Sequence, residues 1–374
     1  MWQRSVQRGG IPLGKILISG YYGFSNAGDE AMLTAIVTSL KQQDPQVELT
    51  VISGNPEVTA RLHPVKAVHR FDLPGICRAM AGTDLLLSGG GSLLQNVTSR
   101  LSLYYYLSLI ALAAVMGKKI MLFAQGIGPI RGWFSRRLTR LVCRQADLIT
   151  VRDDGSLDDL KSMGFDPAAI HVTSDAVFSL PEGRKQEGLR LLEKLGVDPS
   201  RPLVGFALRH WKGEKRFVRE FARAADELKK RFQAQIVFVP LQFPADGELS
   251  NQVAEAMENR RDVFILDQKC STQGYQDLIS CLHLLIGMRL HALVFAAIND
   301  VPFMAISYDP KVDRFVDGMK GTVVDTIGQV TAEELTAMAE KIWNSDGRQG
   351  REQIRALREE ARANIGRALA LLAR

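Results

Sequence analysis

Short aliphatic runs alternate with longer helical stretches along the chain. Runs of about four to eight apolar residues bounded by turn residues are typical of strands buried in a parallel sheet. In the N-terminal part, such runs lie at 15–19, 47–53, 84–88, 119–123 and 148–151. Helices are predicted between them at 29–42, 101–117 and 156–163, whereas residues 54–80 show no regular period. This order of elements predicts a doubly wound α/β unit.

The alternation restarts after residue 202. Strands are predicted at 203–208, 235–239, 263–266, 283–286 and 302–307, with helices at 214–232, 246–259, 273–281 and 289–297. Residues 181–202 are polar, charged and bounded by prolines, as in a hinge between domains. We therefore predict an α/β protein with two doubly wound Rossmann-like domains. Its predicted parts are a disordered segment 1–14, a first domain 15–180, a linker 181–202, a second domain 203–346 and a C-terminal helix 347–374 packed on the domains.

The apolar run 284–297 is interrupted in a way that suggests a site. It breaks at Gly287 and restarts with Arg289 and His291 before an aliphatic tail. A strand-to-helix turn in a parallel sheet lies at the carboxyl edge, where helix amides favour an anion. A structural alternative is open at this stage: a histidine among apolar residues is often a satisfied core group, and an arginine can pair with a core carboxylate.

Other predicted strands also end in glycine-rich or basic loops. The loop 20–30 fits neither GxGxxG nor a P-loop, because Asp29 stands where the phosphate-binding lysine belongs. Gly90 and Gly91 follow the strand 84–88, and Arg131 follows 119–123, ahead of Arg136, Arg137, Arg140 and Arg144, which we interpret as surface residues. Arg209 and Lys311 follow two strands of the second unit. Basic groups that recur at strand ends favour an anion site, since random surface charge does not follow strand ends.

Composition narrows the possible functions. The 374 residues include 47 Lys and Arg against 41 Asp and Glu, a net charge of +6 with a pI near 9.1. This mild excess suits an anionic substrate or membrane face better than a dedicated nucleic-acid binder, because no basic stripe with interleaved aromatics is present. The four cysteines form no close pair and no zinc-ligand spacing, so we expect reduced thiols in a cytoplasmic protein. The apolar stretch 101–117 is short for a membrane span and predicts a buried helix.

Five motifs in order resemble polysaccharide pyruvyl transferases. They are Ile18-Ser19-Gly20-Tyr21-Tyr22-Gly23 with Asn26 and Gly28-Asp29-Glu30, then Gly89-Gly90-Gly91-Ser92-Leu93-Leu94-Gln95, Gly126-Ile127-Gly128-Pro129, Met288-Arg289-Leu290-His291 and Ser307-Tyr308-Asp309-Pro310-Lys311. The resemblance, closest to members that act on bacterial cell walls, implies a fold similar to GT-B glycosyltransferases, with two domains facing a cleft. It implies phosphoenolpyruvate as donor and a lipid-linked N-acetylmannosamine residue of a secondary cell-wall polymer as acceptor. Pyruvate would become a cyclic ketal, with phosphate released.

The resemblance also places residues in roles. His291, Arg131 and Lys311 match family positions around the donor and are predicted as catalytic. Our hypothesis makes His291 the acid and base of the reaction or a group that assists the departure of phosphate, because a histidine with a pKa near neutrality can serve as acid and then as base. The remaining predicted site residues are Arg289, Arg209, Gly90, Gly91 and Ser307 at the donor, and Tyr21, Tyr22 and Asn26 at the acceptor. Neither a metal nor a cofactor is predicted, since basic groups can neutralise the donor.

Two other functions and one membrane contact stay open. A GT-B glycosyltransferase with a nucleotide-sugar donor would use similar basic groups, and a polysaccharide-binding protein without activity could keep the same fold. The terminal helix carries Arg351, Arg355, Arg358 and Arg362 on one face. We favour packing of this helix on the protein, while its basic face also allows peripheral contact with the anionic inner surface of the cell membrane.

Overall fold

The computed structural model describes residues 14–97, 99–211, 214–308, 310–319, 323–324, 330–345 and 350–374. The chain forms two compact units. Unit 1 comprises 1–23, 36–173 and 362–374, and unit 2 comprises 24–35 and 174–361. The division falls inside two helices, α1 (Ala27–Gln43) and α14 (Arg351–Leu372), so each unit contains segments from distant parts of the sequence.

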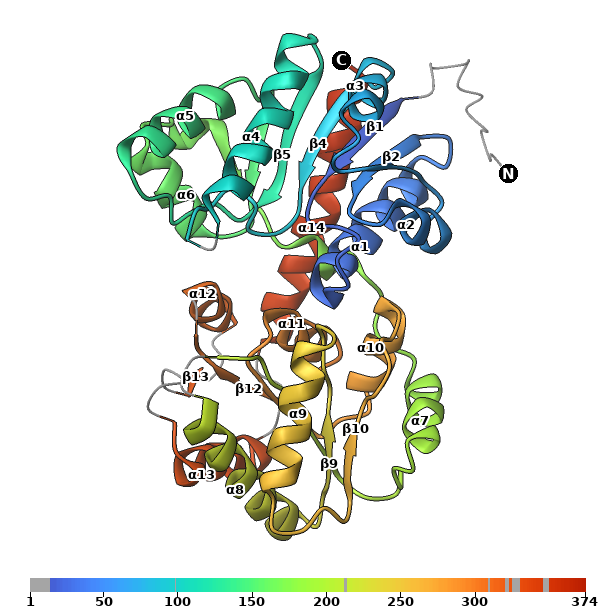
Figure 1. The fold of residues 1–374 in the computed structure, drawn as a ribbon, viewed down its shortest axis with the longest axis vertical. Helices are drawn as coiled ribbons and strands as arrows, with labels where there is room; N and C mark the ends of the chain where they lie inside the picture. The colour runs from blue at the N-terminus through green and yellow to red at the C-terminus, as the bar shows by residue number, and fades with distance from the viewer. Residues whose placement is uncertain are drawn as a thin grey trace, which may run out of the picture. The chain divides into compact units, whose positions relative to one another are not determined.

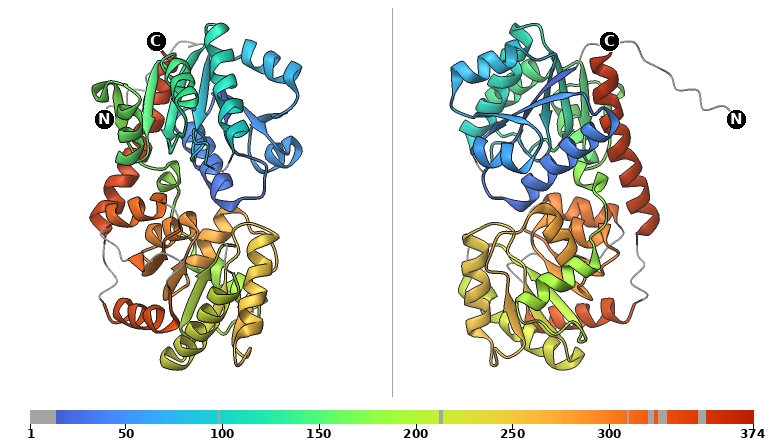
Figure 2. Two further views of the ribbon diagram at one scale, coloured as in Figure 1. Left: turned by 60° about the vertical axis from the view of Figure 1, so that its left-hand side comes forward. Right: turned by 90° about the vertical axis from the view of Figure 1, so that its right-hand side faces the viewer.

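Unit 1 is built on a seven-stranded parallel sheet with the order β3-β2-β1-β4-β5-β6-β7. Its strands are β1 (Lys15–Ser19), β2 (Glu48–Ser53), β3 (Lys66–His69), β4 (Leu85–Gly89), β5 (Lys119–Gln125), β6 (Leu148–Val151) and β7 (Ile170–Val172). The helices that connect them are α2 (Pro56–Leu62), α3 (Leu73–Ala81), α4 (Arg100–Val115), α5 (Trp133–Cys143), α6 (Asp154–Ser162) and the 3-10 helix η1 (Pro167–Ala169). Helix α4 covers one face of the sheet, and the C-terminal part of α14 runs along the other (Figures 1 and 2).

Unit 2 has a six-stranded parallel sheet with the order β10-β9-β8-β11-β12-β13. The strands are β8 (Leu203–Ala207), β9 (Gln235–Phe238), β10 (Val263–Ile265), β11 (Leu284–Gly287), β12 (Phe303–Ile306) and β13 (Val323–Val324). The helices are η2 (Ala176–Ser179), α7 (Lys185–Lys194), α8 (Glu214–Phe232), α9 (Ala245–Ala256), α10 (Thr272–Ile279), α11 (Leu290–Ile298), α12 (Pro310–Gly318) and α13 (Ala332–Trp343). Both sheets share one order, with the fourth strand of each unit beside its first. The predicted pair of Rossmann-like domains is confirmed.

Polar residues just before the helices fix where many helices begin. Ser99 caps α4, Asp153 caps α6 and Ser271 caps α10, each by accepting a backbone N–H from the first turn of its helix. Thr331 and Glu334 form a capping box at α13. The caps matter for function because they stand between a strand and the next helix, at the carboxyl edge of the parallel sheet.

The structure corrects three parts of the predicted organisation. Residues 181–202 are no open linker: they contain α7, whose Arg184 pairs with the buried Asp277 of α10 inside unit 2. Residues 54–80, which showed no period, form α2, β3 and α3, elements too short to display one. The predicted boundary near 180 lies instead between 173 and 174, and the segment 24–35 belongs to unit 2. The predicted disorder of 1–14 falls, except for Gly14, outside the described residues.

Helix α4 is less buried than its sequence predicts. Its inner side is packed in the core of unit 1, but Leu101 and Val115 keep 81% and 87% of their surface exposed. Among the described residues, no helix combines the length and the apolar character needed to cross a bilayer.

Candidate functional site

Three adjacent strands of unit 2 bring the predicted basic groups to one edge of their sheet. Gly287 at the end of β11 pairs with Ala207 of β8 on one side and Ala305 of β12 on the other. The segments that follow these strands carry Arg209, His291 and Lys311. The sequence prediction that these residues share a carboxyl edge is therefore met inside unit 2.

His291 lies in the first turn of α11 with its side chain 15% exposed. Its Nε2 has no hydrogen-bond partner among the described residues, and it lies 3.7 Å from Oδ2 of Asp175. Asp175 accepts the Val177 N–H through its other oxygen, Oδ1, at the start of η2. The carboxylate is thus held by the backbone with its other oxygen directed at the imidazole.

The first turn of α1 forms the opposite wall of the histidine. A Cβ on Gly28 would lie only 2.0 Å from His291 Nδ1, so any larger residue would displace the ring. Asn26 fixes this turn by accepting the Gly28 N–H, and its backbone forms a bridge with Gln242. The close approach to His291 explains why position 28 is a glycine better than a phosphate-binding role would.

Asp29 follows Gly28 and is partly buried in the same place. Burial raises the pKa of Asp29 from 3.8 to about 6, while the positive charges of His291 and Lys311 oppose that rise. The negative charges of Glu30 and Asp175 add to it. Asp29 therefore exchanges its proton near neutrality, which is what a general acid or base requires.

Tyr308 organises the basic groups beside this cluster. The guanidinium of Arg209 lies 4.5 Å from the centre of its ring, and Nζ of Lys311 lies 5.5 Å from it. Trp211 contacts the same ring, with 5.6 Å between the ring centres. Cation–π contacts thus hold both cations close to the same ring. Ser307, also predicted at the donor, is buried at the end of β12.

Arg289 has a structural role that does not fit the predicted contact with a donor. Its Nε donates to Oδ2 of the fully buried Asp246 at 2.9 Å, and its Nη2 bonds Asp246 Oδ1 and Gln242. Asp246 also accepts the N–H groups of Leu241 and Gln242. Leu241 in turn accepts the N–H of Ala27 at the start of α1. Arg289 therefore supports the first turn of α1, which packs against His291.

In unit 1, glycine loops surround a second arginine. Gly90 and Gly91 have φ of 70° and 82°, values that favour glycine, and the carbonyl of Gly91 accepts the side-chain amide of Gln125. Arg152, whose side chain is 8% exposed, donates to Ser92 Oγ at 2.8 Å. Gly126 leaves room for this guanidinium, because a Cβ there would lie 2.9 Å from its Nε. Gly126 thus serves packing around Arg152, which the sequence prediction did not select.

The other predicted residues of unit 1 differ in accessibility. Arg131 is exposed, and its backbone is fixed by Asn96, which bonds both its N–H and its carbonyl. Tyr21 is 37% exposed. Tyr22 is fully buried and donates its hydroxyl to the carbonyl of Gly89, so it does not fit the predicted contact with an acceptor. Its place in the first motif led to the prediction, whereas the structure shows its ring packed against Gly20.

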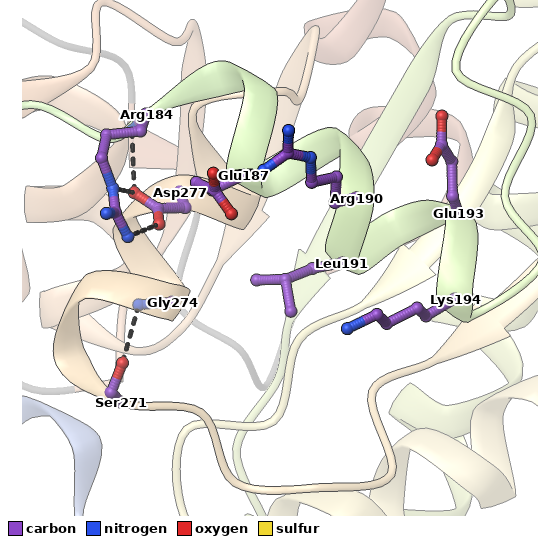
Figure 3. Close-up of a pocket in the computed structure, with 9 residues that line it drawn as sticks. All are labelled: Arg184, Glu187, Arg190, Leu191, Glu193, Lys194, Ser271, Gly274 and Asp277. Atoms are coloured by element: carbon purple, nitrogen blue, oxygen red, sulfur yellow. Dashed lines mark hydrogen bonds and ion pairs between the residues drawn. The ribbon is translucent and has the colours of Figure 1, made fainter.

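Unit 2 also has a surface pocket away from these residues. It lies between α7 and α10, has a volume of about 540 Å³ and is lined by the nine residues drawn in Figure 3. Arg184 pairs with Asp277, and Glu187 pairs with Arg190, so much of its charge is neutralised internally. None of the residues predicted for the site lines this pocket. The cluster around His291 is therefore the stronger candidate for chemistry.

Three residues of the cluster escaped the sequence prediction. Asp29 and Tyr308 stand within the motifs given above but were assigned no role, and Asp175 was not selected. Asp175 and Tyr308 follow the strands β7 and β12 closely, a signal that was used for basic residues alone.

Comparisons with known proteins place this geometry in context. The family model described as "Polysaccharide pyruvyl transferase" matches residues 26–310. No curated protein sequence matches the chain. Solved structures with a similar fold include the UDP-GlcNAc 2-epimerase from Methanocaldococcus jannaschii, with 11% identity, a TM-score of 0.69 and coverage of 95% of this chain and 99% of that one.

Two further structures agree with this result. The UDP-GlcNAc 2-epimerase from Neisseria meningitidis bound to UDP-GlcNAc has 12% identity and a TM-score of 0.63, covering 95% of this chain and 100% of that one. The glycosyltransferase from Rickettsia africae ESF-5 has 14% identity and a TM-score of 0.60, covering 97% and 96%. At such identities the likeness concerns the fold alone, and it confirms the GT-B type of architecture.

Proposed function

The chain belongs to the polysaccharide pyruvyl transferase family, and from this premise we propose that it transfers pyruvate from phosphoenolpyruvate to a sugar as a cyclic ketal. The proposed acceptor is an N-acetylmannosamine residue of a lipid-linked precursor of secondary cell-wall polysaccharide. The observation that carries the proposal is the cluster of His291, Asp29 and Asp175 beside Lys311 in unit 2.

The proposed reaction needs groups that exchange protons in both directions. An acid protonates the methylene carbon of phosphoenolpyruvate, and C2 becomes electrophilic. A sugar hydroxyl bonds to C2 and loses its proton to a base. A second hydroxyl then bonds to C2 while the C–O bond to phosphate breaks, so phosphate leaves with that electron pair and the second proton is released. His291, whose Nε2 lies 3.7 Å from the Asp175 carboxylate, supplies the acid, and Asp29 is the base for a hydroxyl.

The donor brings a phosphate and a carboxylate that must be neutralised. Arg209 and Lys311 both lie close to the ring of Tyr308 and provide two positive charges. Arg131, an exposed residue of unit 1, stays a predicted donor contact. Arginine suits both anions because its planar fork bonds two oxygens at once. Arg289 is not assigned to the donor, because its guanidinium is paired with Asp246.

Phosphorus NMR tests the reaction directly. The protein is incubated with phosphoenolpyruvate and a panel of amino-sugar acceptors, and we expect free phosphate to appear only when an acceptor is present. The matched control is His291→Ala, for which phosphate release should stop. Acceptor-dependent phosphate release that is the same in both proteins would contradict the assignment of His291, and no release with any acceptor would contradict the donor.

A glycosyltransferase with a nucleotide-sugar donor is the second candidate. It is favoured by one observation, the fold shared with a solved glycosyltransferase and with an epimerase bound to UDP-GlcNAc. The same NMR experiment with a UDP-sugar separates the two, because this reaction releases a nucleoside diphosphate. A protein that binds polysaccharide without reacting would release neither product while retaining sugar affinity.

We further propose that the reaction needs no metal ion. Among the described residues, no group of three or more His, Cys, Asp and Glu side chains is placed to hold one. We expect full phosphate release after treatment with a chelator. Activity that is lost in chelator and restored by Mg²⁺ would overturn this part of the proposal.

A further inference from the structure

Exposed large apolar side chains are distributed very unevenly over the described residues. All eleven of them belong to unit 1, and none belongs to unit 2. Six of these side chains lie in the first turns of α3, α4 and α5 or in the loops before them. We call these six, together with the arginines beside them, the aromatic–arginine surface. The six are Phe71, Leu73, Val97, Leu101, Trp133 and Phe134.

Ring and cation–π contacts join the parts of this surface. Tyr104 of α4 touches Phe134 of α5, with 6.5 Å between the ring centres, and Phe134 touches Trp133 at 6.2 Å. On the other side of α4, the guanidinium of Arg70 lies 4.8 Å from the ring centres of both Tyr105 and Phe71. Leu101 precedes Tyr104 and Tyr105 by three and four residues on the same helix, so it shares their side. The three helices therefore present one aromatic region, and α4 lies at its centre (Figure 1).

The part of the sequence that carries most of these side chains has charges of one sign only. Between Asp84 and Asp147 the sequence contains no acidic residue, but it contains eight basic ones. They are Arg100, Lys118, Lys119, Arg131, Arg136, Arg137, Arg140 and Arg144. Asp72 is the nearest acid on the α3 side, and its carboxylate is occupied in capping that helix. Exposed tryptophan, phenylalanine and leucine side chains thus belong to a stretch of sequence with only positive charges, and among the described residues neither Arg100 nor Arg137 forms an ion pair.

We propose that the aromatic–arginine surface docks on an anionic phospholipid bilayer. Trp133 and Phe134, 72% and 58% exposed, would enter the interfacial region, where aromatic rings are favoured. Arg100 and Arg137 are exposed beside them and would meet lipid phosphates. A protein partner would need a strongly acidic surface to match this charge, whereas a bilayer supplies apolar and anionic groups together. The inference does not depend on the proposed reaction.

The surface differs from the terminal helix, on which the sequence placed membrane contact. The large apolar residues of α14, such as Ile354 and Ile365, are buried against the protein. Its arginines are interspersed with Glu352, Glu359 and Glu360, and Arg355 pairs with Glu359. Helix α14 therefore offers a bilayer neither an apolar face nor an unopposed positive charge.

Sedimentation with lipid vesicles tests the inference without any substrate. Vesicles of phosphatidylcholine are compared with vesicles that also contain phosphatidylglycerol, and we expect tight binding only to the second kind. The double substitution Trp133→Ser with Phe134→Ser should weaken binding by tenfold or more, and so should Arg100→Glu with Arg137→Glu. Matched controls are Leu62→Ser, an exposed leucine on α2, and Arg355→Glu on α14, which should bind like the wild type.

Every outcome decides the matter. Loss in both double variants, with retention in both controls, supports docking through this surface. Equal binding to neutral and anionic vesicles, or wild-type binding by the variants, overturns it. Absence of vesicle binding together with self-association that the variants abolish would assign the surface to a second copy of the chain. Since binding is measured without donor or acceptor, failure of the proposed reaction would leave this result unaffected.

Discussion

Helices α4 and α11 occupy the same place in their two units, and they differ in what covers them. Each follows the fourth strand of its sheet, beside the first strand, and each is strongly apolar in sequence. Helix α11 is buried along its length apart from His291 in its first turn, whereas α4 has Leu101 at the same position, 81% exposed. Equivalent helices thus serve unit 2 as the support of a buried acid–base cluster and unit 1 as an exposed apolar surface.

The loops before these helices account for part of the difference. Only Met288 and Arg289 separate β11 from α11, so His291 is held close to the sheet edge. Ten residues, 90–99, separate β4 from α4 and begin with two glycines in left-handed conformations. A short turn fixes a side chain for chemistry, whereas a long loop spreads residues over a surface. Similar strand order therefore does not predict similar use of the carboxyl edge.

Within the comparison of the two units, the largest effect is expected for a substitution of His291. Replacing it with alanine removes the proposed acid, and we expect kcat to fall by about a thousandfold, within the range typical of general acid–base catalysis. Steady-state phosphate release measures the effect. His171→Ala, an exposed histidine of unit 1, is the matched control and should keep the wild-type kcat. A His291→Ala enzyme within threefold or so of the wild type would remove the chemistry from unit 2.

The arginines of the two units are expected to respond in different ways. Arg289→Ala leaves Asp246 buried without its cation and should lower the free energy of unfolding by about 3 kcal/mol. Arg131→Ala, at an exposed position of unit 1, should leave stability nearly unchanged and raise the donor KM by about tenfold. Thermal melts and donor titration calorimetry separate the two effects. Unchanged donor affinity in Arg131→Ala would contradict its predicted role.

The Asp29 carboxyl is expected to lower the free energy of unfolding at neutral pH and to be needed for activity. The unfolded chain ionises this carboxyl near 3.8 and the folded protein near 6, so folding stability is full at low pH and declines as pH rises through about 6. Asp29→Asn removes that loss and should raise the free energy of unfolding by about 2 kcal/mol at neutral pH while lowering kcat. Melts across the pH range check the sign. A variant whose advantage does not shrink toward pH 4 or so would show that the shift is not the cause.

The smallest effect is expected on the exposed surface of unit 1. Trp133→Ser with Phe134→Ser should change the free energy of unfolding by less than about 0.5 kcal/mol, because neither side chain is part of the core. Chemical denaturation measures this. Phe123→Ser, at a fully buried position of β5, is the contrast and should destabilise strongly. A comparable loss in both proteins would mean that the surface stabilises the fold.

Much of the fold was predictable because its signals are local. The strands at 15–19 and 148–151 and the helix at 214–232 appear in the structure with the predicted bounds. The helix at 185–194 was missed because polar residues and flanking prolines are also typical of linkers, and burial against α10 decides between the two. The assignment of 24–35 to unit 2 was out of reach, since it depends on long-range contacts such as that between Ala27 and Leu241.

The site was predictable in kind rather than in detail. Strand ends indicated where Arg209, His291 and Lys311 would gather, and they do lie at one edge of unit 2. The sequence could not show that Arg289, two residues from His291, pairs with Asp246, because that partner is 43 positions away. Nor could it show that Asp29 and Asp175 approach the same imidazole from segments far apart in the chain.

The segment 24–35 has a practical consequence for dissecting the molecule. A fragment spanning 174–361 would contain His291, Asp175 and Lys311 but would lack Gly28, Asp29 and the strand bridge at Asn26. Its imidazole would lose one wall, and the carbonyl of Leu241 would lose its partner. Excising this domain by a single cut therefore yields an incomplete site, whereas a splice that joins 24–35 to 174–361 through a designed linker keeps every residue of the cluster.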